Sequence, residues 1–257
     1  MTSTSLPARA APARNSGYWE IVAQLAAAQK TAARSAPAYS RFINRKLGRL
    51  LAAWAYRAGL TPNAVTGISA AFTFSGIALL MVLPHSAGLG IAVALLLVIG
   101  YAFDSADGQV ARLRGGGSPA GEWLDHVFDA AKVSMLPLAL AVGMYRFGAT
   151  GTAWLLVPLA SAVVSAVLFF GMILTEQLRR QHGVKAAPAG KGRGSWLRAL
   201  AVLPMDYGVL CLSFLLLGWT AVFTTVYTLI FAGTAAFLLA ALPKWYRDLA
   251  YAGKQER

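Results

Sequence analysis

Residues 104–112 read Asp-Ser-Ala-Asp-Gly-Gln-Val-Ala-Arg, and residues 121–129 read Gly-Glu-Trp-Leu-Asp-His-Val-Phe-Asp. Both stretches belong to apolar windows that are long enough to cross a membrane as helices. An aspartate near the centre of a membrane helix costs about 2.5–3.5 kcal/mol, so four unpaired aspartates would cost on the order of 10 kcal/mol. Packing does not explain such a cluster. A divalent metal ion, which prefers hard oxygen ligands, explains it best.

The spacing of these residues places them on two helix faces, because successive helical residues are about 100° apart. One face carries Asp104, Asp107, Gly108 and Ala111, with Arg112 at its edge. The other face carries Gly121, Asp125 and Asp129 at intervals of four residues. Two helices joined by the short intervening loop can point these faces at each other. Each helix would then supply two carboxylates to one cavity.

The composition of the whole chain is that of an integral membrane protein. The 257 residues are 57% hydrophobic and only 13% charged, with a formal net charge of +13 and a mean hydropathy of +0.56. These values exclude an ordinary soluble globular domain. The expected partner of such a chain is the lipid bilayer, and no nucleic-acid partner is expected.

Six apolar windows predict an all-α, polytopic fold with six transmembrane helices. They cover roughly residues 64–84, 88–111, 121–145, 152–174, 199–217 and 220–242. The expected organisation is a disordered tail (1–18), a cytoplasmic or interfacial helical segment (19–60), a six-helix domain (61–243) and a cytoplasmic tail (244–257).

The segment before the first window predicts an amphipathic helix at the membrane interface. Its apolar residues recur at helical intervals, and they are Tyr39, Phe42, Ile43, Leu47, Leu50, Leu51 and Trp54. Its basic residues fall on other faces, and they are Arg41, Arg45, Lys46 and Arg49. Such a helix can lie on anionic lipid. The alternative is a helix that docks on the spans without contacting lipid.

The distribution of basic residues predicts the orientation. Of the 23 Lys and Arg residues, all but Lys132 and Arg146 fall in segments on one side of the six windows. The positive-inside rule then places both termini and the aspartate cluster on the cytoplasmic side. The Ala-, Arg- and Gly-rich composition is typical of a bacterium with a GC-rich genome, so the inner (plasma) membrane is the expected location.

The pattern D-x-x-D-G-x-x-A-R-x8-G-x3-D-x3-D at residues 104–129 resembles the signature of the CDP-alcohol phosphotransferases, the CDP-alcohol phosphatidyltransferase family. This resemblance implies transfer of a substituted phosphate group from a CDP-linked donor to an alcohol, with release of CMP, in phospholipid biosynthesis. The expected donor is CDP-diacylglycerol. Serine, glycerol phosphate and inositol phosphate all remain open as the small alcohol acceptor. The resemblance also implies a homodimer.

The resemblance further implies a centre that holds two Mg²⁺ or Mn²⁺ ions. Asp104, Asp107 and Asp125 would be metal ligands, and Asp129 would be both a ligand and the general base. Two such ions clamp the phosphoryl group that is transferred. Asp206 is the next candidate for the base, or for an acceptor contact or a partner of a basic loop residue. His126 is expected to be structural, because it lies 100° from the face of Asp125 and Asp129.

The same resemblance assigns substrate contacts to eight residues, most of which have a simpler alternative. Arg112 would contact the donor, and Gly108, Ala111 and Gly121 would let the nucleotide approach, or would only pack helices. Asn63 and Thr66 belong to a P-N-x-x-T element that resembles the family's nucleotide pocket. Ser118 would contact the donor or only cap a helix. Lys132 would bind an acceptor phosphate or form a salt bridge with an aspartate.

A different class of protein, a cation transporter that uses the aspartates as its ion site, is also compatible with six spans. It leaves Gly108, Ala111 and Arg112 unexplained, and it places all four carboxylates near one membrane face. A catalytically inactive scaffold is a third possibility, which the intact aspartates disfavour.

Overall fold

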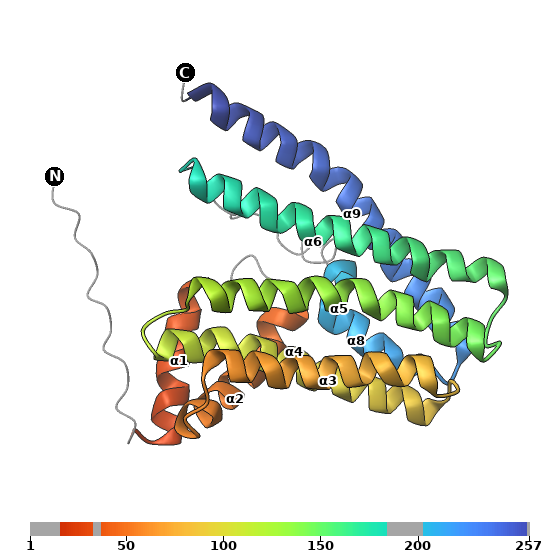
Figure 1. The fold of residues 1–257 in the computed structure, drawn as a ribbon, viewed down its shortest axis with the longest axis horizontal. Helices are drawn as coiled ribbons and strands as arrows, with labels where there is room; N and C mark the ends of the chain where they lie inside the picture. The colour runs from red at the N-terminus through yellow and green to blue at the C-terminus, as the bar shows by residue number, and fades with distance from the viewer. Residues whose placement is uncertain (1–15, 33–36, 184–202, 256–257) are drawn as a thin grey trace.

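The computed structural model describes residues 16–32, 37–183 and 203–255, and every regular element in these ranges is helical (Figure 1). The long helices are α3 (Pro62–Val82), α4 (Ala87–Leu113), α5 (Pro119–Arg146), α6 (Leu156–Gln181) and α9 (Thr220–Gln255). Shorter helices are α1 (Tyr18–Ala32), α2 (Arg45–Arg57) and α8 (Tyr207–Ser213). A π-helical turn (Ser40–Asn44) and 3₁₀ turns at Thr152–Leu155, Leu203–Met205 and Phe214–Leu216 complete the described elements. The predicted all-α class is confirmed.

Within the described residues, five helical segments are long and apolar enough to cross a membrane. They are Pro62–Val82, Ala87–Leu113, Pro119–Arg146, Thr152–Gln181 and Thr220–Ala250, and they match five of the six predicted windows. The remaining window corresponds to a shorter apolar helix, Tyr207–Leu216. At about 1.5 Å per residue this helix is about 15 Å long, roughly half the hydrocarbon thickness. Residues 199–202 of that window lie outside the described residues, as does most of the predicted disordered tail.

The starts of three long helices follow from side-chain caps that satisfy free backbone N–H groups. The hydroxyl of Thr61 accepts from Ala64 N at 3.2 Å at the start of α3. Ser86 accepts from Leu89 N at 3.1 Å in the same way for α4. The N-cap of α5 is Ser118, which is followed by a proline in the first turn. The capping alternative for Ser118 is therefore present, whatever else this residue contacts.

Small residues let α3 approach its neighbours closely, as is common between membrane helices. A Cβ atom on Gly100 of α4 would collide with the hydroxyl of Thr73, and one on Gly143 of α5 would collide with the carbonyl oxygen of Leu80. Ser69 also donates a hydrogen bond to the Gly100 carbonyl at 2.8 Å. These contacts fix the register of α4 and α5, the two helices that carry the aspartates.

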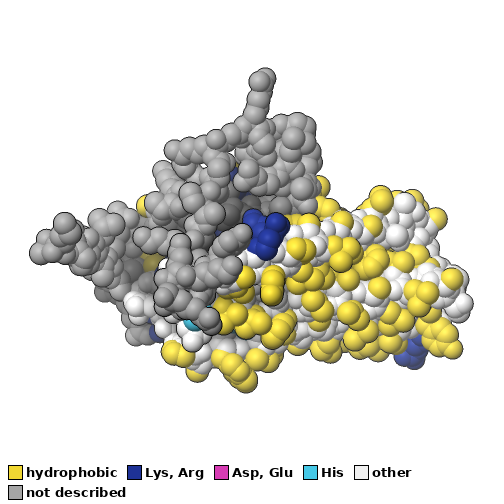
Figure 2. All heavy atoms as spheres, turned by 90° about the horizontal axis from the view of Figure 1, so that it is seen from above, with side chains coloured by type: hydrophobic (Ala, Val, Ile, Leu, Met, Phe, Trp, Pro, Cys, Tyr) yellow, Lys and Arg dark blue, Asp and Glu magenta, His cyan; other side chains and the backbone are white. Residues whose placement is uncertain are grey.

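The segment before α3 both docks on the bundle and presents an apolar surface. Small residues of α2, such as Ala52 and Ala53, are buried against α4. The large apolar side chains point outward, with exposed fractions between 38% and 56%, and they are Phe42, Ile43, Leu47, Leu50 and Trp54. Figure 2 shows one face of the molecule, on which hydrophobic side chains predominate among the described residues. The geometry thus agrees with an interfacial helix that is also docked.

Candidate active site

A cavity of about 770 Å³ opens where α3 and α5 begin and α4 ends. We call it the donor cavity. Its wall includes nine of the residues that the sequence singled out, namely Asn63, Thr66, Asp107, Gly108, Ala111, Arg112, Ser118, Gly121 and Asp125. The sequence did not single out Arg114 or Glu122, which also line it. The two helix faces predicted from spacing therefore do converge.

The loop between α4 and α5 shapes the mouth of the donor cavity. Gly115 and Gly116 have φ angles of 94° and 132°, which L-residues with side chains rarely adopt. Arg114 donates from Nη2 to the carbonyl oxygens of Gly59 and Leu60, at 2.8 Å each. The loop is thereby tied to the segment that leads into α3.

The backbone of α4 and α5 is open to the cavity at the motif glycines. A Cβ on Gly108 would meet only an Arg112 guanidinium nitrogen, at 3.7 Å, so this glycine is not required for helix packing. A Cβ on Gly121 would lie 3.0 Å from Asn63 Oδ1, another lining atom. These distances favour the substrate interpretation of Gly108 over the packing alternative.

Asp107 is buried at the floor of the donor cavity, with 7% of its surface exposed. Thr66 Oγ1 donates to its Oδ2 at 2.6 Å, and the backbone N–H of Gly108 donates to its Oδ1 at 2.5 Å. These bonds hold the carboxylate in one orientation. The sequence predicted Thr66 as a donor contact, and the structure adds that it positions Asp107.

Asp104 and Asp129 do not line the donor cavity, and both form a salt bridge with Lys132. Lys132 Nζ is 3.0 Å from Asp104 Oδ1 and 2.5 Å from Asp129 Oδ1. All three side chains are largely buried, with exposed fractions of 10%, 21% and 22% for Lys132, Asp104 and Asp129. Of the two interpretations of Lys132, the salt bridge is the one that the structure contains. The three residues line a void of only about 10 Å³.

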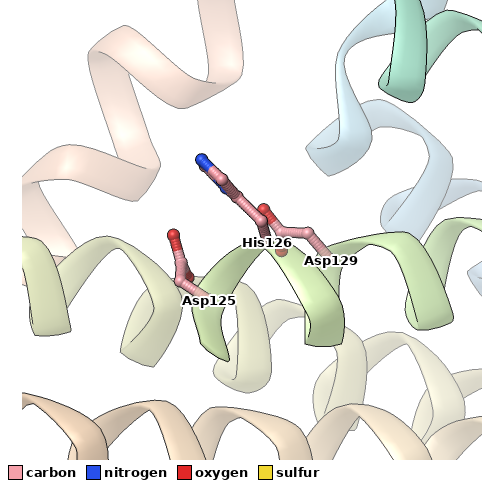
Figure 3. Close-up of side chains that lie close together, drawn as sticks. All are labelled: Asp125, His126 and Asp129. Atoms are coloured by element: carbon pink, nitrogen blue, oxygen red, sulfur yellow. The ribbon is translucent and has the colours of Figure 1, made fainter. Parts of the chain in front are cut away.

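His126, which the helical wheel predicted to be structural, lies close to the carboxylates of Asp125 and Asp129. Ligand atoms of Asp125, His126 and Asp129 lie within 4.8 Å of one another, and Figure 3 shows the three side chains on α5. The ring of His126 also packs edge-on against Phe169 of α6. A 100° separation on a helical wheel describes Cβ atoms, and the longer imidazole reaches back toward the carboxylates. This acidic cluster can hold a metal ion.

Asp206 plays a role that none of its predicted alternatives included. Its carboxylate is 1% exposed and accepts the Gly208 N–H at 3.2 Å, which caps α8. It also accepts the Tyr39 N–H at 2.6 Å, and so ties the segment before α2 to the start of α8. Burial raises the pKa of the Tyr39 hydroxyl, and Cys211 and Asp206 nearby raise it further.

The four aspartates suit a hard divalent cation, because their available ligand atoms are carboxylate oxygens gathered around one region of α4 and α5. Asp107 and Asp125 face the donor cavity, while Asp104 and Asp129 are held together by Lys132. A cation bound by these carboxylates would neutralise charge on a phosphate group.

Comparison with known proteins agrees with this geometry. The family model described as CDP-alcohol phosphatidyltransferase matches residues 59–241. The structure resembles that of phosphatidylinositol phosphate synthase from Mycobacterium tuberculosis with CDP-DAG bound. The TM-score is 0.53 at 22% sequence identity, over 79% of this chain and 94% of that chain, which establishes a common fold. No curated protein matches the chain.

Proposed function

The chain belongs to the CDP-alcohol phosphatidyltransferase family, and from this premise we propose that it transfers a phosphatidyl group from CDP-diacylglycerol to an alcohol and releases CMP. Membership makes it a membrane enzyme of CDP-alcohol transfer in phospholipid biosynthesis. The observation that carries the finer proposal is the donor cavity, whose wall brings Asn63, Arg112 and Gly121 beside Asp107 and Asp125.

Within this proposal, the donor cavity receives the CDP portion of the donor. Arg112 lies at the end of α4 and lines the cavity, so its planar guanidinium is suited to the diphosphate oxygens. Gly108, Ala111 and Gly121 leave room for the nucleotide along the helix backbones. Asn63 and Ser118 add polar groups to the lining close to Gly121.

The reaction is a displacement at the β-phosphorus. The acceptor hydroxyl oxygen forms a new bond to phosphorus, and its proton passes to the carboxylate of Asp129. The bond between the β-phosphorus and the bridging oxygen breaks, and CMP leaves with that electron pair. Asp104, Asp107, Asp125 and Asp129 would hold Mg²⁺ or Mn²⁺, two ions by analogy with the family. Such ions, when bound, stabilise charge on the attacking and leaving oxygens.

We also propose that the donor cavity faces the cytoplasm of a bacterial inner membrane, with both termini on that side. The α4–α5 loop, the end of α6 and the end of α9 lie toward one end of the bundle in Figure 1. The positive-inside rule supports the cytoplasmic assignment of this end. A homodimer is proposed from the family resemblance, and light scattering of the purified protein in detergent would test it.

The decisive experiment measures CDP binding and CMP release with protein purified in detergent. We expect CDP to bind only with Mg²⁺ or Mn²⁺, and CMP release from CDP-diacylglycerol to stop in excess EDTA and return when the metal is restored. Arg112→Ala should weaken CDP binding, whereas Arg146→Ala, at the opposite end of α5, should not. A cation transporter has no reason to bind cytidine. Absence of metal-dependent CDP binding by the wild type would refute the proposal.

A further inference from the structure

A second cavity, of about 160 Å³, lies among α5, α6, α8 and α9. We call it the apolar cavity. Its lining includes Val133, Leu136, Ser165, Phe169, Tyr207 and Thr234. None of the residues assigned to the donor or to the metal in the sequence lines it, so neither the motif nor the donor cavity accounts for it.

Along α5, the apolar cavity lies beyond Asp129 as seen from the donor cavity. Along α5, the donor cavity contacts residues up to Asp125, and the apolar cavity begins at Val133. Asp129 lies between them, four residues from each and therefore on the same helix face. At the wall of the apolar cavity, the ring of Tyr207 lies 5.3 Å from Lys132 Nζ.

The order of the two cavities along α5 bears on the direction from which the acceptor hydroxyl attacks the phosphorus. An in-line displacement places the attacking and leaving oxygens on opposite sides of the phosphorus. With CMP in the donor cavity, the attacking hydroxyl approaches from the side of α5 where the apolar cavity lies. The void beside Asp104 and Asp129 measures only about 10 Å³ and can hold at most a water molecule. The apolar cavity is comparable with an engineered cavity of about 150 Å³ that binds benzene.

The charge of the apolar cavity selects against an anionic ligand. Its described lining contains no Lys, Arg or His, and its one carboxylate is that of Asp206. Both oxygens of Asp206 already accept backbone N–H groups. The nearby ammonium of Lys132 is paired with Asp104 and Asp129. A phosphate in this cavity would therefore lose its hydration without gaining a cation from the described residues.

We propose that the apolar cavity is the acceptor subsite, and that it takes the apolar portion of an uncharged lipid alcohol. This inference rests on the proposed transferase function and names the class of its acceptor. The apolar portion of the acceptor occupies the space beside Ser165. The hydroxyl of the acceptor points toward Asp129.

The first test compares acceptors with the wild-type protein, using CDP-dioctanoylglycerol as donor and CMP release as readout. Octan-1-ol and 1,2-dioctanoylglycerol are the uncharged acceptors, and glycerol 3-phosphate and inositol 1-phosphate are the anionic ones. We expect kcat/KM to be at least about tenfold higher for the uncharged pair. Transfer to the anionic acceptors alone would overturn the inference.

The second test fills the apolar cavity. Ser165→Phe should raise the KM for octan-1-ol at least about tenfold, while metal-dependent CDP binding, which also reports that the variant is folded, stays at the wild-type level. Val167→Phe is the matched control, because Val167 is on the same helix but 41% exposed. A higher KM for the donor in place of the acceptor would assign the cavity to the donor's chain and overturn the inference.

The two proposals fail differently. If the wild type does not bind CDP with metal, the transferase function fails and the acceptor assignment fails with it. If CDP binds and only anionic acceptors react, the transferase function stands and the acceptor assignment alone is wrong.

Discussion

Replacing Lys132 with methionine removes the ammonium group between Asp104 and Asp129 and keeps a side chain of similar length. In the metal-free protein, two largely buried carboxylates then lose a cation that lies 3.0 and 2.5 Å from their oxygens. Breaking a buried ion pair by removing one partner costs about 3–5 kcal/mol. Because the two aspartates keep about a fifth of their exposure, we expect a loss near the lower end, about 3 kcal/mol.

The assay is thermal unfolding in detergent, with and without Mg²⁺. At about 2–4 °C per kcal/mol for a chain of this size, the apparent melting temperature of metal-free Lys132→Met should fall by about 6–12 °C. A ligand at a hundred times its Kd stabilises by about 2.7 kcal/mol. Mg²⁺ should stabilise Lys132→Met more than the wild type, because in the variant it meets no competing ammonium at Asp104 and Asp129.

The control is Lys244→Met, which removes a positive charge from an exposed position on α9 and should leave the melting temperature nearly unchanged. The reasoning is refuted if metal-free Lys132→Met melts within about 2 °C of the wild type, less than the shift of 1 kcal/mol. Equal stabilisation of both proteins by Mg²⁺ would refute the claim that the lysine and the metal compete for the same carboxylates.

Three further outcomes are expected. Asp129→Asn should lower kcat by at least about 10²-fold, the lower end for general base catalysis, with little change in CDP affinity; a wild-type kcat would place the base elsewhere. Arg112→Ala should raise the KM for the CDP donor, measured by CMP release, and an unchanged KM would remove Arg112 from donor binding. Gly143→Ala should lower the melting temperature, because its Cβ would collide with the Leu80 carbonyl, with overpacking of this kind typically costing about 1–3 kcal/mol. Gly67→Ala, where a Cβ would meet nothing within 4 Å, is its control and should melt no lower than the wild type, because alanine is the better helix former.

The long helices and the donor cavity were predictable because both depend on local sequence. Apolar windows of sufficient length and the Thr61-Pro62 and Ser118-Pro119 caps mark the helices. Helical periodicity alone places Asp107, Gly108 and Ala111 on one face and Gly121 and Asp125 on another. The family resemblance was needed to add Asn63 and Thr66, and neither signal indicated Arg114 or Glu122. The fifth window, residues 199–217, predicted a longer apolar helix than Tyr207–Leu216 because hydropathy averages over Asp206, which caps α8.

The remaining features depend on contacts between distant segments. The reach of His126 toward Asp125 and Asp129 depends on its side-chain conformation, which a helical wheel does not contain. The apolar cavity is formed where helices separated by up to about a hundred residues fail to fill the space between them. Its lining residues resemble any buried apolar residues in composition, so no sequence pattern marked them.

Helix α5 meets the donor cavity at Asp125, carries Asp129 one turn later and meets the apolar cavity at Val133. At 1.5 Å per residue these positions are about 6 Å apart along a single axis. Their spacing is thus set by the backbone of one rigid element, and substitutions elsewhere leave it intact. The opposite wall of the apolar cavity comes from α6 and α9. Divergence of the acceptor preference among related proteins would therefore accumulate on those two helices, while the catalytic spacing stays constant.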